Sequence, residues 1–452
     1  MVRDSNRGRL SLSAELRLAN SLRMTKTLQS PETEYYFERF GFCERQILSD
    51  PSSDLGLIIV IPVYNEPELN RALRSIISAD QPDCSVEAII VINSREGEAR
   101  EIQERNRRSA IEARSLGSST PAWLRFHVLE WPNLPRKKGG VGLARKIGMD
   151  EGLRRYDSLN RDEGPIVCLD ADCVCESNYL RAVEHYFSNT EATGAALYFE
   201  HPLTGSEADS IYEAITQYEL HLRYYVQGLR MAGFPFAFHT VGSSMAVRAS
   251  AYRTQGGMNK RQAGEDFYFL HKIIPLGGFG DLTSTRVLAS PRASTRVPFG
   301  TGRAVNDFLQ GRSTTTYNIR SFEQLRVFFD SVAALYEGRK VPPLPEAIEA
   351  FLVEEQFNAA LQEFLGNSSN FINFKKRFFA WFDGFRTMKF LHFARDHFQP
   401  NQSVALAASE LIQKMSPTFC PRPENVHELL LAFRAREREN PIFTKPRSAA
   451  NF

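Results

Sequence analysis

The sequence is poor in cysteine, has no long apolar run and carries almost no net charge. Six cysteines among 452 residues are too few for a disulfide-stapled scaffold, so we expect a protein of the reducing cytoplasm. The longest strongly apolar stretch, residues 55–63, is far shorter than the ~20 residues that cross a bilayer. Residues 1–30 mix arginines with isolated leucines and lack the apolar segment of a secretory signal. We therefore expect no export and no transmembrane span, and a peripheral position at the inner face of the membrane stays open.

The charge balance argues against nucleic acid as the main partner. The chain has 55 lysines and arginines against 53 aspartates and glutamates, a formal charge of +2. Hydrophobic residues make up 42% and charged residues 24%, values that exclude collagen-like, mucin-like and wholly disordered proteins. We therefore expect a folded globular protein in which any basic site is local.

Three cysteines, Cys168, Cys173 and Cys175, lie close together in the sequence. A structural zinc site would need a fourth nearby ligand, and no second C-x-x-C motif occurs. We interpret these residues as small buried thiols.

Short apolar runs alternate with segments of helical periodicity in the first half of the chain. Strand-like runs cover residues 57–63, 86–92, 124–129 and 166–169, and most of them are near-continuously apolar, as buried parallel strands are. This alternation predicts an α/β protein with a mostly parallel central sheet flanked by helices. Ligands of such sheets lie outside the carboxyl ends of the strands.

The fourth of these runs ends in Asp170-Ala171-Asp172. Two carboxylates that are separated by one residue, at the carboxyl end of a buried strand, place hard oxygen ligands in the ligand crevice. Such ligands suit Mg²⁺ or Mn²⁺ bridging a diphosphate. The structural alternative is that Asp172 or Ser177 caps the helix that follows.

Further motifs accompany this one in a fixed order. They are P-V-Y-N-E at residues 62–66, A-R-K-x-G at 144–148, L-D-A-D at 169–172, V-G-S-S-M-A-V-R at 241–248, G-G-M at 256–258 and G-E-D at 264–266. The ordered set resembles glycosyltransferase family 2, whose members use nucleotide diphosphate sugars and have the GT-A fold. The resemblance covers roughly residues 57–302.

The resemblance implies a GT-A fold and the transfer of a sugar from a nucleotide diphosphate sugar to an acceptor hydroxyl. It implies that the loop after the first strand and the end of the second strand hold the base and ribose of the donor. In this sequence those positions are Pro62, Tyr64, Glu66 and Asn93.

The other functional positions of the family also have counterparts here. Asp172 would bind the metal, and Asp170 would contact the ribose or the sugar. Arg145, which belongs to the A-R-K-x-G match, is our candidate for binding phosphate, because guanidinium groups bind phosphate bidentately.

An inverting transfer needs a carboxylate base for the acceptor hydroxyl and a cation that neutralises the departing diphosphate. In the family the E-D pair supplies the base. We assign this role to Asp266, with Glu265 as the second choice, since one residue of register decides which carboxylate faces the sugar. The alternative is that both are helix N-terminal acids, which the helix dipole favours by ~0.3–1 kcal/mol.

Two features depart from the family. Many relatives have an acidic pair where this chain has Asn93-Ser94, so recognition of the base is expected to differ. Several metal-dependent relatives supply a histidine ligand beyond the E-D helix, but no histidine occurs here between His271 and His392, so the third protein ligand of Mn²⁺ or Mg²⁺ is not identified. The Q-x-x-R-W motif of processive polysaccharide synthases is absent, which disfavours a polymer-exporting enzyme.

The acceptor pocket is less well marked. His201, His239 and Gly242 follow strand-like segments and are our candidates to line it, although a lone histidine is more often structural. The acceptor stays open among a glycan, a lipid and a small molecule. Two rival functions also stay open: a non-catalytic nucleotide-sugar-binding protein and, less favoured, a sugar-phosphate nucleotidyltransferase.

We divide the chain into an N-terminal helical or irregular extension (1–54), a glycosyltransferase domain (55–320) and a helical C-terminal region (321–452). Residues 286–320 contain six arginines and a single acid, Asp307. We interpret this segment as a basic loop that closes as a lid over an anionic ligand.

Overall fold

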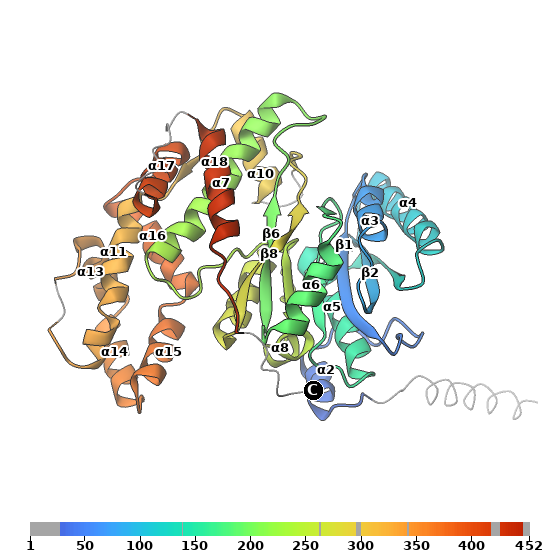
Figure 1. The fold of residues 1–452 in the computed structure, drawn as a ribbon, viewed down its shortest axis with the longest axis horizontal. Coiled ribbons are helices and arrows are strands. Elements are labelled where there is room, and N and C mark those ends of the chain that lie inside the picture. Colours follow the sequence, from blue (N-terminus) through green and yellow to red (C-terminus); the bar gives the residue numbers. More distant parts are fainter. Residues whose placement is uncertain are drawn as a thin grey trace, which may run out of the picture.

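The computed structural model describes residues 28–137, 139–261, 264–294, 300–340, 343–416 and 425–445, and it has an α/β part beside a helical part (Figure 1). The sheet of the α/β part has eight strands in the order β3-β2-β1-β4-β7-β6-β8-β5. The helices of the C-terminal region, drawn in orange and red, gather on one side of it. The fold class predicted from the sequence, a mixed α/β protein with a helical C-terminal region, is confirmed.

The first half of the sheet is parallel. It consists of β1 (Leu55–Val63), β2 (Ser85–Arg95), β3 (Leu124–Leu134) and β4 (Pro165–Cys168). The apolar runs of the sequence predicted each of these strands, with ends that differ by a few residues. Their carboxyl ends lie at one edge of the sheet because all four run in the same direction.

The second half of the sheet is mixed. Its strands are β5 (Val174–Cys175), β6 (Gly194–Glu200), β7 (Met245–Arg248) and β8 (Phe279–Leu288). β7 runs antiparallel to both β4 and β6, and β5 runs antiparallel to β8. The remaining strands share one direction, so the sheet is mostly parallel, as expected.

Helices cover both faces of the sheet, and the side chains of β1 show why its apolar run is unbroken. Leu57, Ile59 and Ile61 belong to one hydrophobic core, and Ile58 and Val60 to another. Successive side chains of a strand point to opposite faces, so a strand covered on both sides is apolar at every position. The first core includes side chains of α3 (Leu69–Ile77), α4 (Arg100–Gly117) and α6 (Tyr179–Asn189), and the second those of α2 (Pro31–Phe40), α5 (Val141–Asp157), α8 (Ala249–Thr254) and α9 (Glu265–Ile273).

The helical part has its own core, which is rich in phenylalanine. It contains α11 (Ile319–Asp330), α12 (Val332–Tyr336), α13 (Glu346–Glu354), α14 (Phe357–Gly366), α15 (Phe371–Trp381), α16 (Gly384–His397), α17 (Val404–Met415) and α18 (Val426–Glu439), with a small ribbon of β9 (Thr315–Thr316) and β10 (Gln402–Ser403). The long helix α7 (Asp209–Met231) joins the two parts, because Leu220 and Tyr224 on one of its faces belong to this core.

The end of the described chain returns to the sheet. α18 packs along α7, as Figure 1 shows in red beside green. After it, the backbone N–H of Asp281 in β8 donates to the carbonyl of Ile442 at 2.9 Å. Within the described parts of the chain, every helix is too short or too polar to cross a bilayer.

The interpretation of residues 286–320 as a basic loop is wrong in the described parts, and its closure as a lid stays a prediction. Arg286 lies in β8 and pairs with Glu176 and Glu200, and α10 (Thr301–Leu309) occupies the middle of the segment. Arg303 and Arg312 both pair with Asp307 at 2.9 Å. The sequence could not reveal that Glu176 and Glu200 are the partners of Arg286, because both lie far from it in the chain. Residues 295–299 are outside the described residues.

Candidate active site

A single cleft of about 740 Å³ lies at the carboxyl ends of the strands, where the sequence placed the ligand site. Its lining includes all the predicted site residues: Pro62, Tyr64, Glu66, Asn93, Arg145, Asp170, Asp172, His201, His239, Gly242, Glu265 and Asp266. The structure thus brings these residues together, while their individual roles stay predictions.

One end of the cleft, the strand-end half, is formed by residues in the last positions of β1 and β2 or directly after β1 and β4: Pro62, Tyr64, Asn93, Asp170 and Asp172. β1 ends in a tight turn, in which Asn65 has a left-handed backbone (φ 50°) and its N–H donates to Asn106 at 2.8 Å. The buried Asn93 donates through its amide nitrogen to the carbonyl of Gly139 at 3.3 Å. Its Oδ1 atom has no hydrogen-bond partner among the described residues, so an acceptor atom is left at this end of the cleft.

Arg145 holds the centre of the site together. It extends from the first turns of α5, is 3% exposed, and forms ion pairs with Asp170 (2.5 Å) and with Glu265. A Cβ atom at position 242 would lie 2.6 Å from Arg145 Cζ, so a larger residue fits there only if the guanidinium or the backbone moves. Gly242 was predicted to line the acceptor pocket, and the structure shows that its immediate neighbour is this guanidinium.

The two candidate bases have different surroundings. Both line the cleft, but Glu265 is buried and paired with Arg145, whereas Asp266 is half-buried. Burial raises the pKa of Glu265 to about 7 and also raises the pKa of Asp266. Asp266 accepts hydrogen bonds from the N–H of Gly242 (2.9 Å) and of Phe267 (2.8 Å), which fix its orientation. Of the two, Asp266 is the carboxylate that lies between the cleft and a rigid backbone.

A second arginine lies near the D-A-D motif. Arg292 pairs with Glu66 at 2.7 Å and also interacts electrostatically with Asp172. Glu66 and Asp172 are both acidic, so their negative charges offset the positive charge of Arg292 in the strand-end half.

The cleft offers few ligands for a resident metal ion. Among the described residues, no group of three histidine, cysteine, aspartate or glutamate side chains is arranged to hold one. Asp170 is engaged by Arg145, which leaves Asp172 as the residue of the motif that we assign to an ion. This donor set fits Mg²⁺ or Mn²⁺ only together with a diphosphate, since Mg²⁺ in proteins is often held by one or two carboxylates plus phosphate oxygens.

The three clustered cysteines, Cys168, Cys173 and Cys175, are free and buried. Burial raises the pKa of the Cys168 thiol and of the Cys175 thiol. Their interpretation as buried thiols is consistent with this arrangement.

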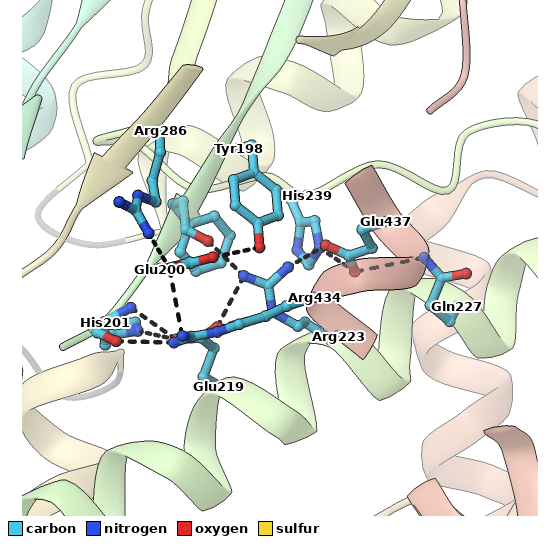
Figure 2. Close-up of polar contacts among 11 residues, drawn as sticks. Tyr198, Glu200, His201, Glu219, Arg223, Gln227, His239, Arg286, Arg434 and Glu437 are labelled. Atoms are coloured by element: carbon cyan, nitrogen blue, oxygen red, sulfur yellow. Dashed lines mark hydrogen bonds and ion pairs between the residues drawn. The ribbon is translucent and has the colours of Figure 1, made fainter. Parts of the chain in front are cut away.

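The two predicted histidines belong to a buried polar network behind the cleft (Figure 2). His201 Nδ1 lies 3.0 Å from the Glu219 carboxylate, and His239 Nε2 lies 3.1 Å from that of Glu437. Arg223, which is fully buried, links Glu219 to Glu437. The carboxylates of Glu219 and Glu437 thus fix the orientation of the two imidazole rings.

The network also connects distant parts of the chain. Arg434 of α18 donates to Glu219 of α7 at 2.7 Å and to the carbonyl of His201 at 2.8 Å. Arg223 donates to the carbonyl of Phe199 in β6. α18 therefore helps to support the cleft, although more than 200 residues of sequence separate Arg434 from Glu219 and His201, which it contacts.

The sequence missed the other end of the cleft. This helical half is lined by Tyr218, His221, Tyr225, Phe238, Tyr317 and Met388. Three of them occur on α7 at i, i+3 and i+7, a spacing that also describes an ordinary core-facing stripe. Only the three-dimensional structure distinguishes the two.

No known family profile and no curated protein matches this chain. Among solved structures, it is similar to S. aureus TarS 1–349 in complex with UDP-GlcNAc, with 14% identity over 85% of this chain and 88% of that chain and a TM-score of 0.34. It is also similar to S. aureus TarS 1–349 (13%, 85% and 90%, 0.33) and to the same fragment in complex with UDP (12%, 85% and 90%, 0.33). At these TM-scores the likeness carries no argument about function.

Proposed function

We propose that this protein is a glycosyltransferase of the family 2 type, with a GT-A fold, that moves a sugar from a nucleotide diphosphate sugar to an acceptor hydroxyl with inversion. One observation carries the proposal: residues from five of the six motifs meet in one cleft at the carboxyl ends of the strands. A set of unrelated loop residues would have no reason to converge there. We propose that the protein acts in the cytoplasm.

The strand-end half would bind the donor. Tyr64 and Asn93 would hold the base and ribose, with Asn93 Oδ1 accepting a hydrogen bond from an N–H of the base. Asp170 would contact the ribose or the sugar. The diphosphate would lie beside Asp172 and Arg292, where guanidinium groups and carboxylates are already close together.

Asp266 would be the general base. It would accept the proton of the acceptor hydroxyl while the hydroxyl oxygen attacks the anomeric carbon of the sugar from the face opposite the diphosphate. The raised pKa of Asp266 makes its carboxylate a better proton acceptor than an ordinary aspartate. The hydrogen bonds from Gly242 and Phe267 would keep it aimed during the transfer. A divalent ion bound with the diphosphate at Asp172 would neutralise the charge of the leaving group.

Two observations weigh against the rival functions. A sugar-phosphate nucleotidyltransferase would need a glycine-rich nucleotide loop after β1, where this chain has Pro62-Val63-Tyr64-Asn65-Glu66. A protein that only binds nucleotide sugars would need no carboxylate of raised pKa in the cleft.

A thermal-shift screen tests the proposal. The protein would be heated with a panel of nucleotide diphosphate sugars, each with and without Mn²⁺. A ligand present at about 100 times its Kd stabilises the folded state by about 2.7 kcal/mol, which is readily measured. A stabilising nucleotide sugar supports the proposal, and the Asp172→Ala variant is the matched control. A panel in which no nucleotide sugar raises the melting temperature of the wild type would contradict it.

A further inference from the structure

We propose that the helical half of the cleft is a binding site for an uncharged carbohydrate, which is the acceptor of the transfer. The inference rests on the proposed function and names the substrate class of the same site. It is carried by side chains from α7, from the segment between α7 and β7, and from the helical part: Tyr218, His221, Tyr225, Phe238, Tyr317 and Met388.

One face of α7 forms the floor of this half. Its cleft-lining residues, Tyr218, His221, Leu222, Tyr225 and Val226, follow the spacing i, i+3, i+4, i+7 and i+8, which places them on a single face of a helix. The remainder of α7 is fixed in the cores and the buried network of the molecule. The floor is therefore rigid and preformed.

Contacts with the helical part complete the walls. The rings of Tyr225 and Tyr317 are 6.1 Å apart, and His221 Nδ1 lies 2.9 Å from Thr316 Oγ1 in β9. Met388 comes from α16. The helical C-terminal region is thus part of the binding site, not only an appended domain.

The helical half is neutral. Burial lowers the pKa of His221 to about 4, so the ring is uncharged at neutral pH. Burial, together with the charge of Asp266, raises the pKa of Tyr218 to about 12. Of the three arginines in the described lining, Arg95 and Arg292 belong to the strand-end half, and Arg145 lies at the centre of the site, where it pairs with Asp170 and Glu265. An anionic acceptor would find no cation among the named side chains of the helical half, whereas an uncharged one needs none.

The site also offers a polar handle. His201 is 3% exposed and lines the cleft, and its Nε2 atom has no hydrogen-bond partner among the described residues. Its Nδ1 faces a carboxylate and therefore carries a proton, so in the neutral ring Nε2 is an acceptor. A buried nitrogen without a partner is costly, and a hydroxyl of a bound ligand would satisfy it.

Aromatic rings, together with an atom that accepts a hydrogen bond from a hydroxyl, suit a sugar ring. The C–H faces of a pyranose are apolar and stack on aromatic side chains, while its rim carries hydroxyls. A polyprenyl chain would fill the apolar walls but would leave His201 Nε2 unpaired. Tyr218 and Asp266 line the same cleft, and the charge of Asp266 influences Tyr218, so we place a hydroxyl of a sugar bound in the helical half beside the proposed base.

The experiment separates this inference from the proposed function. A nucleotide sugar that stabilises the wild type is first confirmed by calorimetry. The protein, saturated with the matching nucleoside diphosphate, is then tested for binding to an array of uncharged oligosaccharides, with a polyol phosphate and a polyprenol in detergent as the other probes. We expect retention of at least one neutral oligosaccharide and of neither other probe.

Two variants complete the test. Met388→Trp fills the helical half without emptying a core, and Tyr225→Ala removes a stacking face, with Tyr225→Phe as its conservative control. Both Met388→Trp and Tyr225→Ala should weaken oligosaccharide binding by at least about tenfold and leave the Kd of the donor unchanged. Unchanged oligosaccharide binding in a folded Met388→Trp variant overturns the inference. So does an array on which the wild type binds no oligosaccharide, and so does binding of only the polyol phosphate or only the polyprenol. Failure of every nucleotide sugar to bind the wild type instead overturns the proposed function.

Discussion

The guanidinium of Arg145 on α5 forms a buried ion pair with the carboxylate of Glu265 on α9. The same guanidinium bonds Asp170 after β4, so one side chain joins three segments of the site. Removing one partner of a buried pair leaves an uncompensated charge. Arg145, first considered as a phosphate ligand, therefore has an additional role in positioning the acidic residues around it.

The pair also assigns different tasks to the two neighbouring acids. Glu265 is held by Arg145, and Asp266 is held by backbone N–H groups at the edge of the cleft. The sequence left the choice between them to one residue of register. The structure favours Asp266 as the base, which remains our proposal.

Metal-dependent donor binding should be lost in Asp172→Ala. The substitution removes the carboxylate that we assign to the ion, while the fold should persist because this side chain is only half-buried. Calorimetric titration of the donor into wild type should show tighter binding with Mn²⁺ than with EDTA, and the variant should show no difference. Equal donor affinity of the wild type in Mn²⁺ and in EDTA would refute the role of a metal.

Gly242→Ala should impair the site without unfolding the protein. The new Cβ would lie 2.6 Å from Arg145 Cζ, so Arg145 or the Gly242 backbone must move, and the hydrogen bond to Asp266 moves with it. Displacements of about 1 Å in an active site can reduce the rate by about 10²-fold. We expect such a fall in kcat with a melting temperature close to that of the wild type. A fully active Gly242→Ala enzyme would show that this contact does not position the base.

The rate of transfer should fall on acidification at a higher pH than an ordinary aspartate would give. The base must be ionised to accept a proton, and burial raises the pKa of Asp266 above its usual 3.8. Glu265, with a pKa of about 7, is a second source of such a limb. Measuring the pH profile of kcat in Glu265→Gln separates the two. A limb that disappears in this variant belongs to Glu265, and one that remains above 3.8 belongs to Asp266.

The buried network should make stability depend on Glu437. Burial alone would raise the pKa of Glu437, but Arg223 and His239 outweigh it and lower the pKa from 4.5 to about 2. Between these two values the unfolded chain binds more protons than the folded one, so this contribution is complete above 4.5 and is lost as the pH falls towards 2. Glu437→Gln breaks the pair with Arg223 and should cost about 3–5 kcal/mol near neutral pH.

Urea unfolding of wild type and Glu437→Gln over a series of pH values measures this effect. The difference in unfolding free energy between the two proteins should shrink as the solution is acidified. The exposed Glu439, on the same helix, gives a matched control, and Glu439→Gln should change stability little. A difference that stays constant with pH would contradict the assigned cause of the shift.

The sequence predicted the parts of the fold that are encoded locally. β1 and β4 are apolar at every position because both faces are covered, and the acids that follow them mark the carboxyl ends. α4 escaped prediction because eight of its 18 residues are charged and it buries only a narrow stripe that includes Ala110 and Ala113. β5 is two residues long, too short for any periodicity to appear.

The site was predicted where a motif carries it and missed where distant segments build it. The pair of Arg292 with Glu66 spans 226 residues, and no local pattern announces it. The role of Tyr218, His221 and Tyr225 on α7 could not be predicted either, since their spacing suits a core as well as a binding site. His201 and His239 line the cleft, while their assignment to an acceptor pocket stays a prediction, and their partners on α7 and α18 became visible only in the structure.

The central claim is that this cleft transfers a sugar with Asp266 as the base, and a comparison of turnover in wild type and Asp266→Asn tests it most directly. Release of nucleoside diphosphate would be measured with a donor that binds the wild type and an oligosaccharide that the protein retains. The variant preserves the size of the side chain and removes its basicity, so kcat should fall by about 10²–10⁴-fold while the Kd of the donor stays the same. Wild-type turnover in Asp266→Asn, or no acceptor-dependent release by the wild type, would contradict the account.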